Sequence, residues 1–342
     1  MKNVLEKLLD KSNLAMEEAY GVMSDIMEGR ATPAQIGAFL IALRLKGETV
    51  EEVSGFAQAM RDKALRLDYP GNLLDTCGTG GDGMGTINIS TLSALVVAGA
   101  GVKVAKHGNR SVSSLCGSAD LLEGLGVKID LPPSTAKKCL DECNFSFLFA
   151  PLYHPAMRYA AGPRKELGVR TVFNILGPLT NPARVKRQLL GVFSPSLTSF
   201  IASVLEKLGV ERAMVVSSLD GIDEISISAP TKVSELRNGT IYEYTIEPER
   251  LGVRTYSLDE LKVKSKEESV EIAQRVLAGE MEGAVMDAVL VNSAAALIVA
   301  GMAKDFKEGM EIARESIRMG LAMRVLENLR RISEEEKGNG DS

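Results

Sequence analysis

Asp75-Thr-Cys-Gly78-Thr-Gly-Gly-Asp82-Gly-Met-Gly-Thr86-Ile-Asn88-Ile-Ser90-Thr91 is a glycine-rich segment followed by an apolar run over residues 92–100. The glycines at positions 78, 80, 81, 83 and 85 lack the Cβ atoms that would keep a ligand away from the backbone. Their N–H groups can therefore converge on an anion. The apolar run predicts a helix, and the positive end of a helix dipole also favours an anion. The segment thus predicts a phosphate-binding loop at a helix N-terminus.

Strand and helix patterns alternate on both sides of this loop. Strands are predicted over residues 73–76, 102–107, 127–131, 145–149, 189–193 and 213–217. Helices are predicted over 89–99, through Leu121 to Gly124 or Gly126, and over 134–143, 155–167, 197–208, 267–278, 283–300 and 306–330. Residues 232–246 read as two strands joined by a turn at Asn238-Gly239. Repeated βα units of this kind predict an α/β domain with a mostly parallel central sheet flanked by helices.

Residues 1–70 carry only helical patterns and predict a small all-helical domain of four short amphipathic helices. Thr32 and Gln35 form a capping box around Pro33, and Thr49 and Glu52 form a second one. Asn13 is a candidate cap for another helix. Pro70-Gly71 marks the boundary with the larger domain. The larger domain is expected over residues 71–335, and the polar residues 336–342 are expected to fray.

The length and composition of the chain restrict the class of protein to which it can belong. A chain of 342 residues with 45% apolar and 25% charged residues is typical of a soluble protein with about two domains. The net charge of −5 gives no general attraction to nucleic acid or to a membrane surface. The four cysteines form no CxxC pair, and Cys139 and Cys143 lie at helical spacing as expected of small core residues. We therefore expect a reducing, cytoplasmic location.

The glycine loop formally matches the dinucleotide fingerprint through Gly78, Gly80 and Gly83. A dinucleotide site needs an acidic residue near the end of the next strand to bind the ribose hydroxyls. That strand ends instead in the cationic pair Lys106-His107, which argues against such a site. No Gly-Lys-Ser/Thr follows the glycines, so the loop is not a Walker A motif either. A glycine-rich turn without a ligand remains the plain structural alternative.

A second polar cluster, Lys106-His-Gly-Asn-Arg110-Ser-Val-Ser-Ser114, follows the next predicted strand. Ligands of open α/β sheets bind at the carboxyl ends of strands, where this cluster is expected to lie. Its cations, hydroxyls and amide suit phosphate oxygens through charge-assisted hydrogen bonds. Ser118 then enters a further helix. The alternative interpretation is a solvated loop.

Three further groups are candidates for the site. Asp223-Glu224 follows a predicted strand and suits Mg²⁺, which takes one or two carboxylates plus phosphate oxygens, although such a pair is often only a polar turn. Either histidine, His107 or His154, could line the site or simply pack in the core. One arginine or lysine among residues 158, 164, 165 and 170 could hold a carboxylate, and spacing alone leaves that choice open.

These motifs together resemble the anthranilate phosphoribosyltransferase family of tryptophan biosynthesis. The matching stretches are residues 75–91, 106–120, 149–157, 164–183 and 220–224, in the family's order. The related pyrimidine nucleoside phosphorylases share the architecture but have a lysine-histidine-serine-threonine-glycine-glycine version of the loop. Departures from the family pattern are small: Ile87 replaces the usual phenylalanine, and Leu115-Cys116 is a variable pair.

The resemblance implies transfer of the phosphoribosyl group from phosphoribosyl pyrophosphate to the amino nitrogen of anthranilate. It also implies a Mg²⁺ cofactor, with two ions per monomer, and no single general base. It implies a return segment near residues 155–182 that completes the helical domain, and a homodimer formed through that domain. A glutamine amidotransferase partner is a further implication, whereas nucleic acid and membrane partners are not expected. A pyrimidine nucleoside phosphorylase-like enzyme and a non-enzymatic nucleic-acid-binding relative are the alternatives.

The site residues that the resemblance implies fall into three sets. The donor set contains Gly78, Gly81, Asp82, Thr86, Asn88, Ile89, Ser90, Thr91, Lys106, His107, Gly108, Asn109, Arg110, Ser111, Val112, Ser113, Ser114 and Ser118. The anthranilate set contains Gly78, His107, Asn109, His154, Arg158, Arg164 and Pro178, with Arg164 expected to face the carboxylate. The metal set contains Ser90, Asp223 and Glu224.

Overall fold

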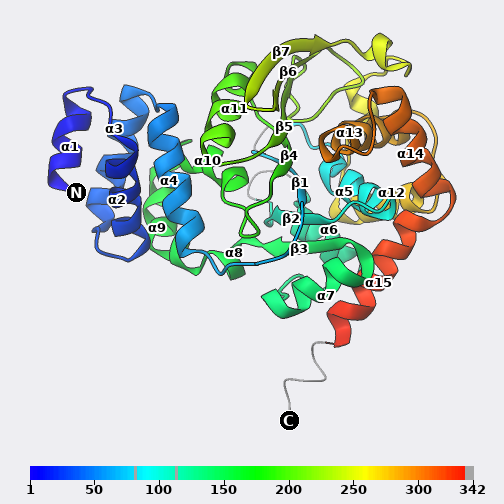
Figure 1. Ribbon diagram of the computed structural model, residues 1–342, viewed down its shortest axis with the longest axis horizontal. Helices are drawn as coiled ribbons and strands as arrows, with labels where there is room; N and C mark the ends of the chain where they lie inside the picture. The colour runs from blue at the N-terminus through cyan, green and yellow to red at the C-terminus, as the bar shows by residue number, and fades with distance from the viewer. Residues whose placement is uncertain (81–82, 112–114, 336–342) are drawn as a thin grey trace.

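A computed structural model describes residues 1–80, 83–111 and 115–335. The first four helices form a bundle at one end of the molecule (Figure 1). They are α1 (Lys2–Leu9), α2 (Met16–Met27), α3 (Pro33–Lys46) and α4 (Val50–Lys63). Both predicted capping boxes are confirmed: Thr32 Oγ1 accepts from the Gln35 amide at 3.3 Å, and Thr49 Oγ1 accepts from the Glu52 amide at 3.3 Å. The all-helical start of the chain is therefore confirmed.

The predicted cap at Asn13 is wrong. Helix α2 begins after Ala15, whose amide donates to the Glu18 carboxylate at 3.0 Å. Asn13 Oδ1 instead accepts a hydrogen bond from Lys46 Nζ at 2.9 Å, so it ties the loop before α2 to the end of α3.

One seven-stranded sheet organises the rest of the chain, in the order β3-β2-β1-β4-β5-β6-β7. The strands are β1 (Leu74–Gly78), β2 (Val104–Gly108), β3 (Phe145–Phe149), β4 (Arg187–Gly191), β5 (Arg212–Ser218), β6 (Thr231–Arg237) and β7 (Thr240–Ile246). The first five strands are parallel, and β6 and β7 add an antiparallel hairpin at the edge. The predicted mostly parallel sheet is confirmed.

Helices cover both faces of the sheet because neighbouring residues of a strand point to opposite sides. Leu189 packs with one core that contains α5, α13 and α15, and Leu190 packs with a second core that contains α11 and the bundle. The helices after the bundle are α5 (Ile89–Gly99), α6 (Ser118–Gly124), α7 (Pro133–Cys143), α8 (Ala150–Tyr153), α9 (Arg158–Leu167), α10 (Phe173–Leu176), α11 (Thr198–Lys207), α12 (Lys266–Leu277), α13 (Ala284–Ala300), α14 (Phe306–Arg318) and α15 (Leu321–Glu335).

Two of the predicted elements differ in the structure. The predicted strand over 127–131 is wrong: Val127, Ile129 and Leu131 are buried, but the Lys128 amide donates to Ser333 Oγ of α15 at 3.2 Å instead of to a strand. The alternating apolar residues thus reflect packing beneath α15. The single helix predicted over 306–330 is divided into α14 and α15 by Gly320, whose φ of +69° favours glycine.

The bundle is joined to the sheet by side-chain and helix contacts. Helix α9 packs against α2 and α3, which lie far from it in sequence (Figure 1). Arg61 of α4 is buried and donates from Nε to the Leu179 carbonyl at 2.7 Å and from Nη1 to the Leu208 carbonyl at 3.2 Å. A buried cation with these carbonyl partners fixes α4 against the segment around residue 179 and the end of α11. The bundle therefore has a defined position relative to the sheet.

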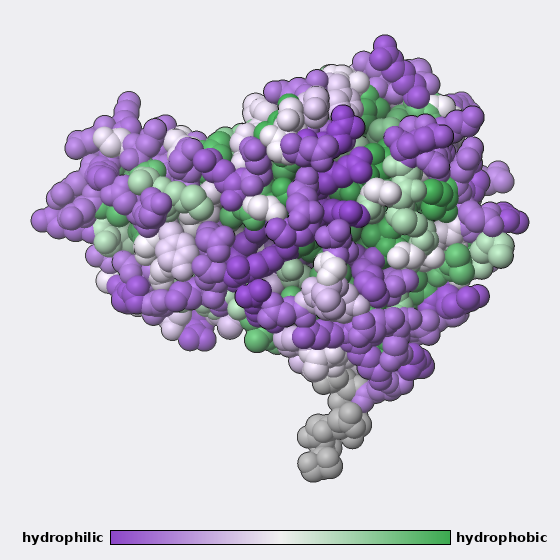
Figure 2. Space-filling view, in the orientation of Figure 1, coloured by the Kyte–Doolittle hydropathy of each residue, from purple (hydrophilic) through white to green (hydrophobic). Residues whose placement is uncertain are grey.

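The surface in Figure 2 is predominantly hydrophilic over the bundle and along α15. Within the described residues, no helix combines the length and apolar character that a membrane span requires.

Candidate functional site

The site lies at the carboxyl ends of the parallel strands. The chain winds outward from β1 through β2 to β3, and β4 begins again on the other side of β1. Such a reversal leaves a crevice between the two central strands, where ligands of open α/β sheets bind. A cleft of about 950 Å³ occupies this position and extends from Gly78 to Arg164 of α9 and Pro178. That volume is sufficient for a substrate-sized molecule.

Paired glycines at this reversal make room for the loop that carries Asp223 and Glu224, called the carboxylate loop below. Gly78 and Gly191 are register partners in β1 and β4, and Asp223 lies directly against both. A Cβ on Gly78 would lie 2.2 Å from Asp223 Oδ2, and a Cβ on Gly191 would lie 1.4 Å from the Asp223 carbonyl oxygen. Asp223 Oδ2 also accepts from the Gly80 amide at 2.7 Å. The two glycines therefore bring the glycine loop and the carboxylate pair into contact.

Gly191→Ala is expected to destabilise the protein. The new Cβ would collide with the backbone of Asp223, which cannot rotate away as a side chain can. Overpacking of this kind costs about 1–3 kcal/mol, or several degrees in melting temperature. Gly37→Ala is the matched control, because no atom lies within 4 Å of its added Cβ. Calorimetric melting of both variants tests the clash, and a Gly191→Ala protein as stable as wild type would contradict it.

The N-terminus of α5 lies in the cleft behind the glycine loop. Thr76 Oγ1 donates to the Ser90 carbonyl at 2.9 Å, which ties the helix start to β1. Asn88 is held by Cys116 and by Ser269, at 2.9 and 3.1 Å, so its position is fixed before any ligand binds. Ser90 and Thr91 line the cleft in the first turn of the helix. This arrangement of hydroxyls and helix N–H groups suits an anion.

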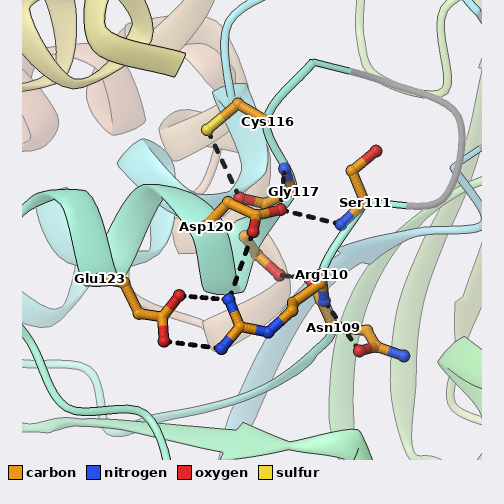
Figure 3. A network of polar contacts seen from close by, with 8 residues as sticks. Asn109, Arg110, Ser111, Cys116, Gly117, Asp120 and Glu123 are labelled. Carbon is orange, nitrogen blue, oxygen red and sulfur yellow. Dashed lines mark hydrogen bonds and ion pairs between the residues drawn. The ribbon is translucent and has the colours of Figure 1, made fainter.

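The loop after β2 is organised by Asp120 of α6 (Figure 3). Asp120 Oδ2 accepts from the amides of Ser111 and Gly117, each at 2.9 Å. Arg110 forms a two-pronged ion pair with Glu123, whose Oε1 lies 2.7 Å from Nη2. Because Asp120 bridges the two ends of the loop, the backbone of residues 109–111 is held at the rim of the cleft.

A buried charged pair lies beneath the two loops. Lys106 and Asp75 are 2% and 0% exposed. Burial raises the pKa of Asp75 to about 6, although the nearby Lys106 cation and a 2.8 Å hydrogen bond from Asn181 oppose that rise. Burial likewise lowers the pKa of Lys106, against the attraction of Asp75. Lys106 Nζ donates to the Thr76 carbonyl and to Ser90 Oγ, the latter at 3.4 Å, so its charge is directed toward the start of α5.

The two histidines lie side by side, with ring centroids 5.1 Å apart. His107 lines the cleft, whereas His154 is buried behind it and its Nε2 lies 3.0 Å from the Thr180 carbonyl oxygen. Burial lowers the pKa of both imidazoles, to about 4 for His154, so both rings are neutral at pH 7. His154 therefore supports the Thr180 segment and the His107 ring from behind.

Acid is expected to destabilise the protein through His154. Its pKa of about 4 when folded lies below the ordinary 6.5, so the unfolded chain binds the extra proton between these values. Stability from this group is complete above pH 6.5 and is lost as pH falls toward 4. The loss between pH 7.5 and 5 is about 2 kcal/mol. Urea unfolding of wild type and His154→Phe at both pH values measures it by difference, because Asp75 and His107, whose pKa values are also shifted, remain in both proteins. Equal pH dependence would contradict the assignment.

Four cations lie near the far end of the cleft, and the structure distinguishes them. Arg164 lines the cleft, lies over the Phe173 ring at 4.8 Å, and has its pKa lowered by burial. Among the described residues it forms no ion pair with a carboxylate. Lys165 and Arg170 also line the cleft. Arg158 does not: it stacks on Tyr159 at 4.7 Å and hydrogen-bonds to the phenol oxygen at 2.9 Å.

The carboxylate pair fits a magnesium site of the kind that also uses substrate oxygens. Asp223, Glu224 and Ser90 line the same cleft. Over residues 1–80, 83–111 and 115–335, no group of three or more histidine, cysteine or acidic side chains could hold a metal by itself. Mg²⁺ commonly binds through one or two carboxylates plus phosphate oxygens and water, so this pair suffices when a diphosphate is also present.

The structure brings most of the predicted site residues together. The predicted residues that line the cleft are Gly78, Thr86, Asn88, Ser90, Thr91, Lys106, His107, Gly108, Asn109, Arg110, Ser111, Ser118, Arg164, Pro178, Asp223 and Glu224. Ile89 is a fully buried core residue, and His154 and Arg158 lie outside the lining, because each contacts other residues. Gly81, Asp82, Val112, Ser113, Ser114 and the tail 336–342 lie outside the described residues.

Several residues that line the cleft carry no prediction from the sequence. They include Phe173, Asn174 and Gly177. The irregular run Asn174-Ile-Leu-Gly177-Pro178 is visible in the sequence, and its Gly-Pro turn is the signal that could have marked it. Lys165 and Arg170 are predicted only as candidates for the carboxylate contact. These residues come from a segment far from the glycine loop in sequence, so their approach to it depends on the fold.

Comparisons with known proteins agree with this geometry. The family model described as glycosyl transferase family, a/b domain, matches residues 70–323, and the helical bundle domain of the same family matches residues 2–64. An anthranilate phosphoribosyltransferase of Pelotomaculum thermopropionicum is 52% identical over 331 residues, which are 96% of this chain and 95% of the relative.

Two solved structures extend the comparison. The crystal structure of anthranilate phosphoribosyltransferase from Thermus thermophilus matches with a TM-score of 0.92 and 44% identity, over 97% of this chain and 99% of that one. The enzyme from Saccharomyces cerevisiae in complex with PRPP and Mg matches with a TM-score of 0.90 and 29% identity, over 97% of each chain. With the glycine loop, the carboxylate pair and Arg164 in one cleft, this chain belongs to the anthranilate phosphoribosyltransferase family.

Proposed function

We propose that this cleft holds phosphoribosyl pyrophosphate at the glycine loop and anthranilate at Arg164, and joins them through the anthranilate nitrogen. The observation that carries the proposal is one continuous cleft lined by anion-binding groups at one end and by Arg164 at the other. The family's activity supports the same pairing of substrates. The site residues implied by the sequence resemblance remain a proposal, and the lining of the cleft supports most of them.

The reaction forms the bond between the anthranilate nitrogen and the anomeric carbon of the ribose, and breaks the bond between that carbon and pyrophosphate. The nitrogen loses a proton, and pyrophosphate departs with the electron pair of the broken bond. An aromatic amine is already neutral at pH 7, so the chain needs no strong base to prepare it. The difficult part is the negative charge on the leaving group and the cationic character of the ribose carbon. Fixed N–H groups, cations and metal ions stabilise such charge most effectively when they are preorganised.

Residues at the donor end are suited to bind the pyrophosphate. Ser90 and Thr91 in the first turn of α5 line the cleft together with Lys106 and the glycine loop. Asp223, Glu224 and Ser90 would hold Mg²⁺, which supplies positive charge to the departing diphosphate when it is bound. We propose two ions per monomer, as the family resemblance implies, with Asp223, Glu224 and Ser90 available as ligands in one cleft.

Residues at the other end are suited to bind anthranilate. Arg164 offers a planar guanidinium to the carboxylate, and burial strengthens that attraction. Asn109, Pro178 and the neutral His107 ring line the same cleft. Holding the two substrates in one cleft converts their encounter into a unimolecular step, which supplies much of the rate.

Three assignments concern the protein beyond its active site. We propose a homodimer formed through the helical domain of residues 1–70 and a return segment near 155–182, supported by the high exposure of Leu9 and Leu45 on α1 and α3 (74% and 79%). A glutamine amidotransferase partner and a cytoplasmic location also remain proposals. Sedimentation equilibrium of wild type and Leu45→Asp tests the dimer.

The alternative enzymatic function is a pyrimidine nucleoside phosphorylase-like activity. Incubation with thymidine and inorganic phosphate is expected to release no base, whereas anthranilate, phosphoribosyl pyrophosphate and Mg²⁺ are expected to release pyrophosphate. Chromatography separates the two outcomes. Base release without pyrophosphate release would contradict this proposal and favour the phosphorylase-like activity. Retention of a nucleic acid probe without either reaction would favour the non-enzymatic relative.

A further inference from the structure

The carboxylate loop is supported from behind by Asn292 of α13. Asn292 is 1% exposed, and its Oδ1 accepts from the Ile225 amide at 3.0 Å. Its Nδ2 donates back to the Ile225 carbonyl and to the Ala288 carbonyl, both at 2.9 Å. The side chain thus pairs with both backbone groups of the residue that follows Glu224, much as a neighbouring strand would.

The same helix also positions the opposite side of the site. Helix α13 packs against α5, and Ser93 Oγ of α5 donates to the Val289 carbonyl of α13 at 3.3 Å. Ser90 stands three residues earlier, in the first turn of α5. Helix α13 therefore packs against the helix that carries Ser90 and also hydrogen-bonds to the loop that carries Asp223 and Glu224.

The space between these groups is small. A second cavity, of about 10 Å³, is lined by residues that include Thr76, Ser90, Asp223, Glu224 and Asn292. That volume is about the minimum that holds one water molecule. Asp223 and Glu224 also line the main cleft, whereas Asn292 does not, and Asn292 holds the backbone of the residue that follows them.

We infer that Asn292 is a positioning residue for the metal-bound donor: it fixes the backbone at Ile225 and so sets how Asp223 and Glu224 face the diphosphate. The inference rests on the proposed function of the carboxylate pair. Groups that orient metal ligands typically change metal affinity or activity by about 10–100-fold when they are removed. Asn292 does not line the main cleft, where both substrates are proposed to bind, so it acts through the backbone that carries Asp223 and Glu224.

The main test compares Asn292→Leu, which keeps the volume but loses all three hydrogen bonds, with wild type. Mn²⁺ binding in the presence of phosphoribosyl pyrophosphate, followed by electron paramagnetic resonance, is expected to weaken by about tenfold or more. The KM for the metal-bound donor is expected to rise in parallel, and the KM for anthranilate is expected to change less than about twofold. Raised Mg²⁺ is expected to recover part of the lost rate, which a general packing defect would not allow.

Ser293→Ala is the matched control, because Ser293 is the next residue of α13, is fully buried, and makes no hydrogen bond to the carboxylate loop among the described residues. Wild-type Mn²⁺ affinity is expected in this variant. If Ser293→Ala weakened Mn²⁺ binding as much as Asn292→Leu, the effect would belong to the helix core and the inference would be overturned.

A second variant covers the case in which Asn292→Leu does not fold. Thr231 Oγ1 accepts from the Ser226 amide at 3.0 Å, so Thr231→Val loosens the same loop from the side of β6. It is expected to weaken Mn²⁺ binding in the same direction. Unchanged Mn²⁺ affinity in a folded Asn292→Leu, or in Thr231→Val if the first is unfolded, would overturn the inference. Absence of metal-dependent turnover in wild type would instead overturn the proposed function itself.

Discussion

Replacing both carboxylates, in Asp223→Asn with Glu224→Gln, is expected to lower kcat/KM for phosphoribosyl pyrophosphate by about 10³-fold. Asp223 contacts the glycine loop beside the paired glycines of β1 and β4, and Glu224 lines the same cleft, where the leaving diphosphate is proposed to bind. Loss of one preorganised group that stabilises transition-state charge costs about 10²–10³-fold, and this variant loses both carboxylates of the site. The fold should survive, because each substitution keeps the shape of the side chain.

The matched control is a second adjacent acidic pair, Asp259 and Glu260, which is exposed and lies outside the cleft. Asp259→Asn with Glu260→Gln is expected to keep the wild-type Mg²⁺ dependence. Steady-state rates across a Mg²⁺ titration compare the two double variants. A wild-type titration curve in the Asp223/Glu224 variant would remove these residues from the metal site.

Arg164→Ala is expected to lower kcat/KM for anthranilate by about 10–100-fold. A charge-assisted hydrogen bond contributes about 1.5–3 kcal/mol, and a two-pronged contact from a partly buried guanidinium lies at the upper end. The KM for phosphoribosyl pyrophosphate should change little, because the donor residues lie at the other end of the cleft.

Arg158→Ala is the control for Arg164→Ala. It removes the same kind of side chain from the same helix, but Arg158 stacks on Tyr159 and does not line the cleft. Its kcat/KM for anthranilate is expected to stay within about twofold of wild type. Equal losses in the two variants would mean that helix α9, and not the Arg164 guanidinium, is what anthranilate binding requires.

Local patterns in the sequence were sufficient for the fold class. The capping boxes at Thr32 and Thr49 predicted two helix starts, because a cap depends on residues only three positions apart. The alternation of strands and helices predicted the parallel sheet for the same local reason. The pattern predicted a strand over residues 127–131 that the structure does not contain. Alternating apolar residues also occur where a segment without strand partners is buried beneath a helix such as α15.

The site was predictable where residues are consecutive and less so where the fold brings distant residues together. The glycine loop and the segment after β2 were recognisable from their own composition. Spacing could not separate Arg164 from Arg158, because only the packing of α9 decides which guanidinium enters the cleft. Neither Asn181 nor Asn292 was predicted as a site residue, yet each forms buried hydrogen bonds to residues more than 60 positions away.

One cleft is proposed to join anthranilate to the phosphoribosyl donor with the help of Mg²⁺. The most direct measurement is anthranilate fluorescence during incubation of the folded protein with phosphoribosyl pyrophosphate and Mg²⁺. We predict a steady loss of fluorescence that requires the donor and the metal together and stops on addition of a chelator. No loss in a folded sample, or a loss that continues without the donor, would contradict this function.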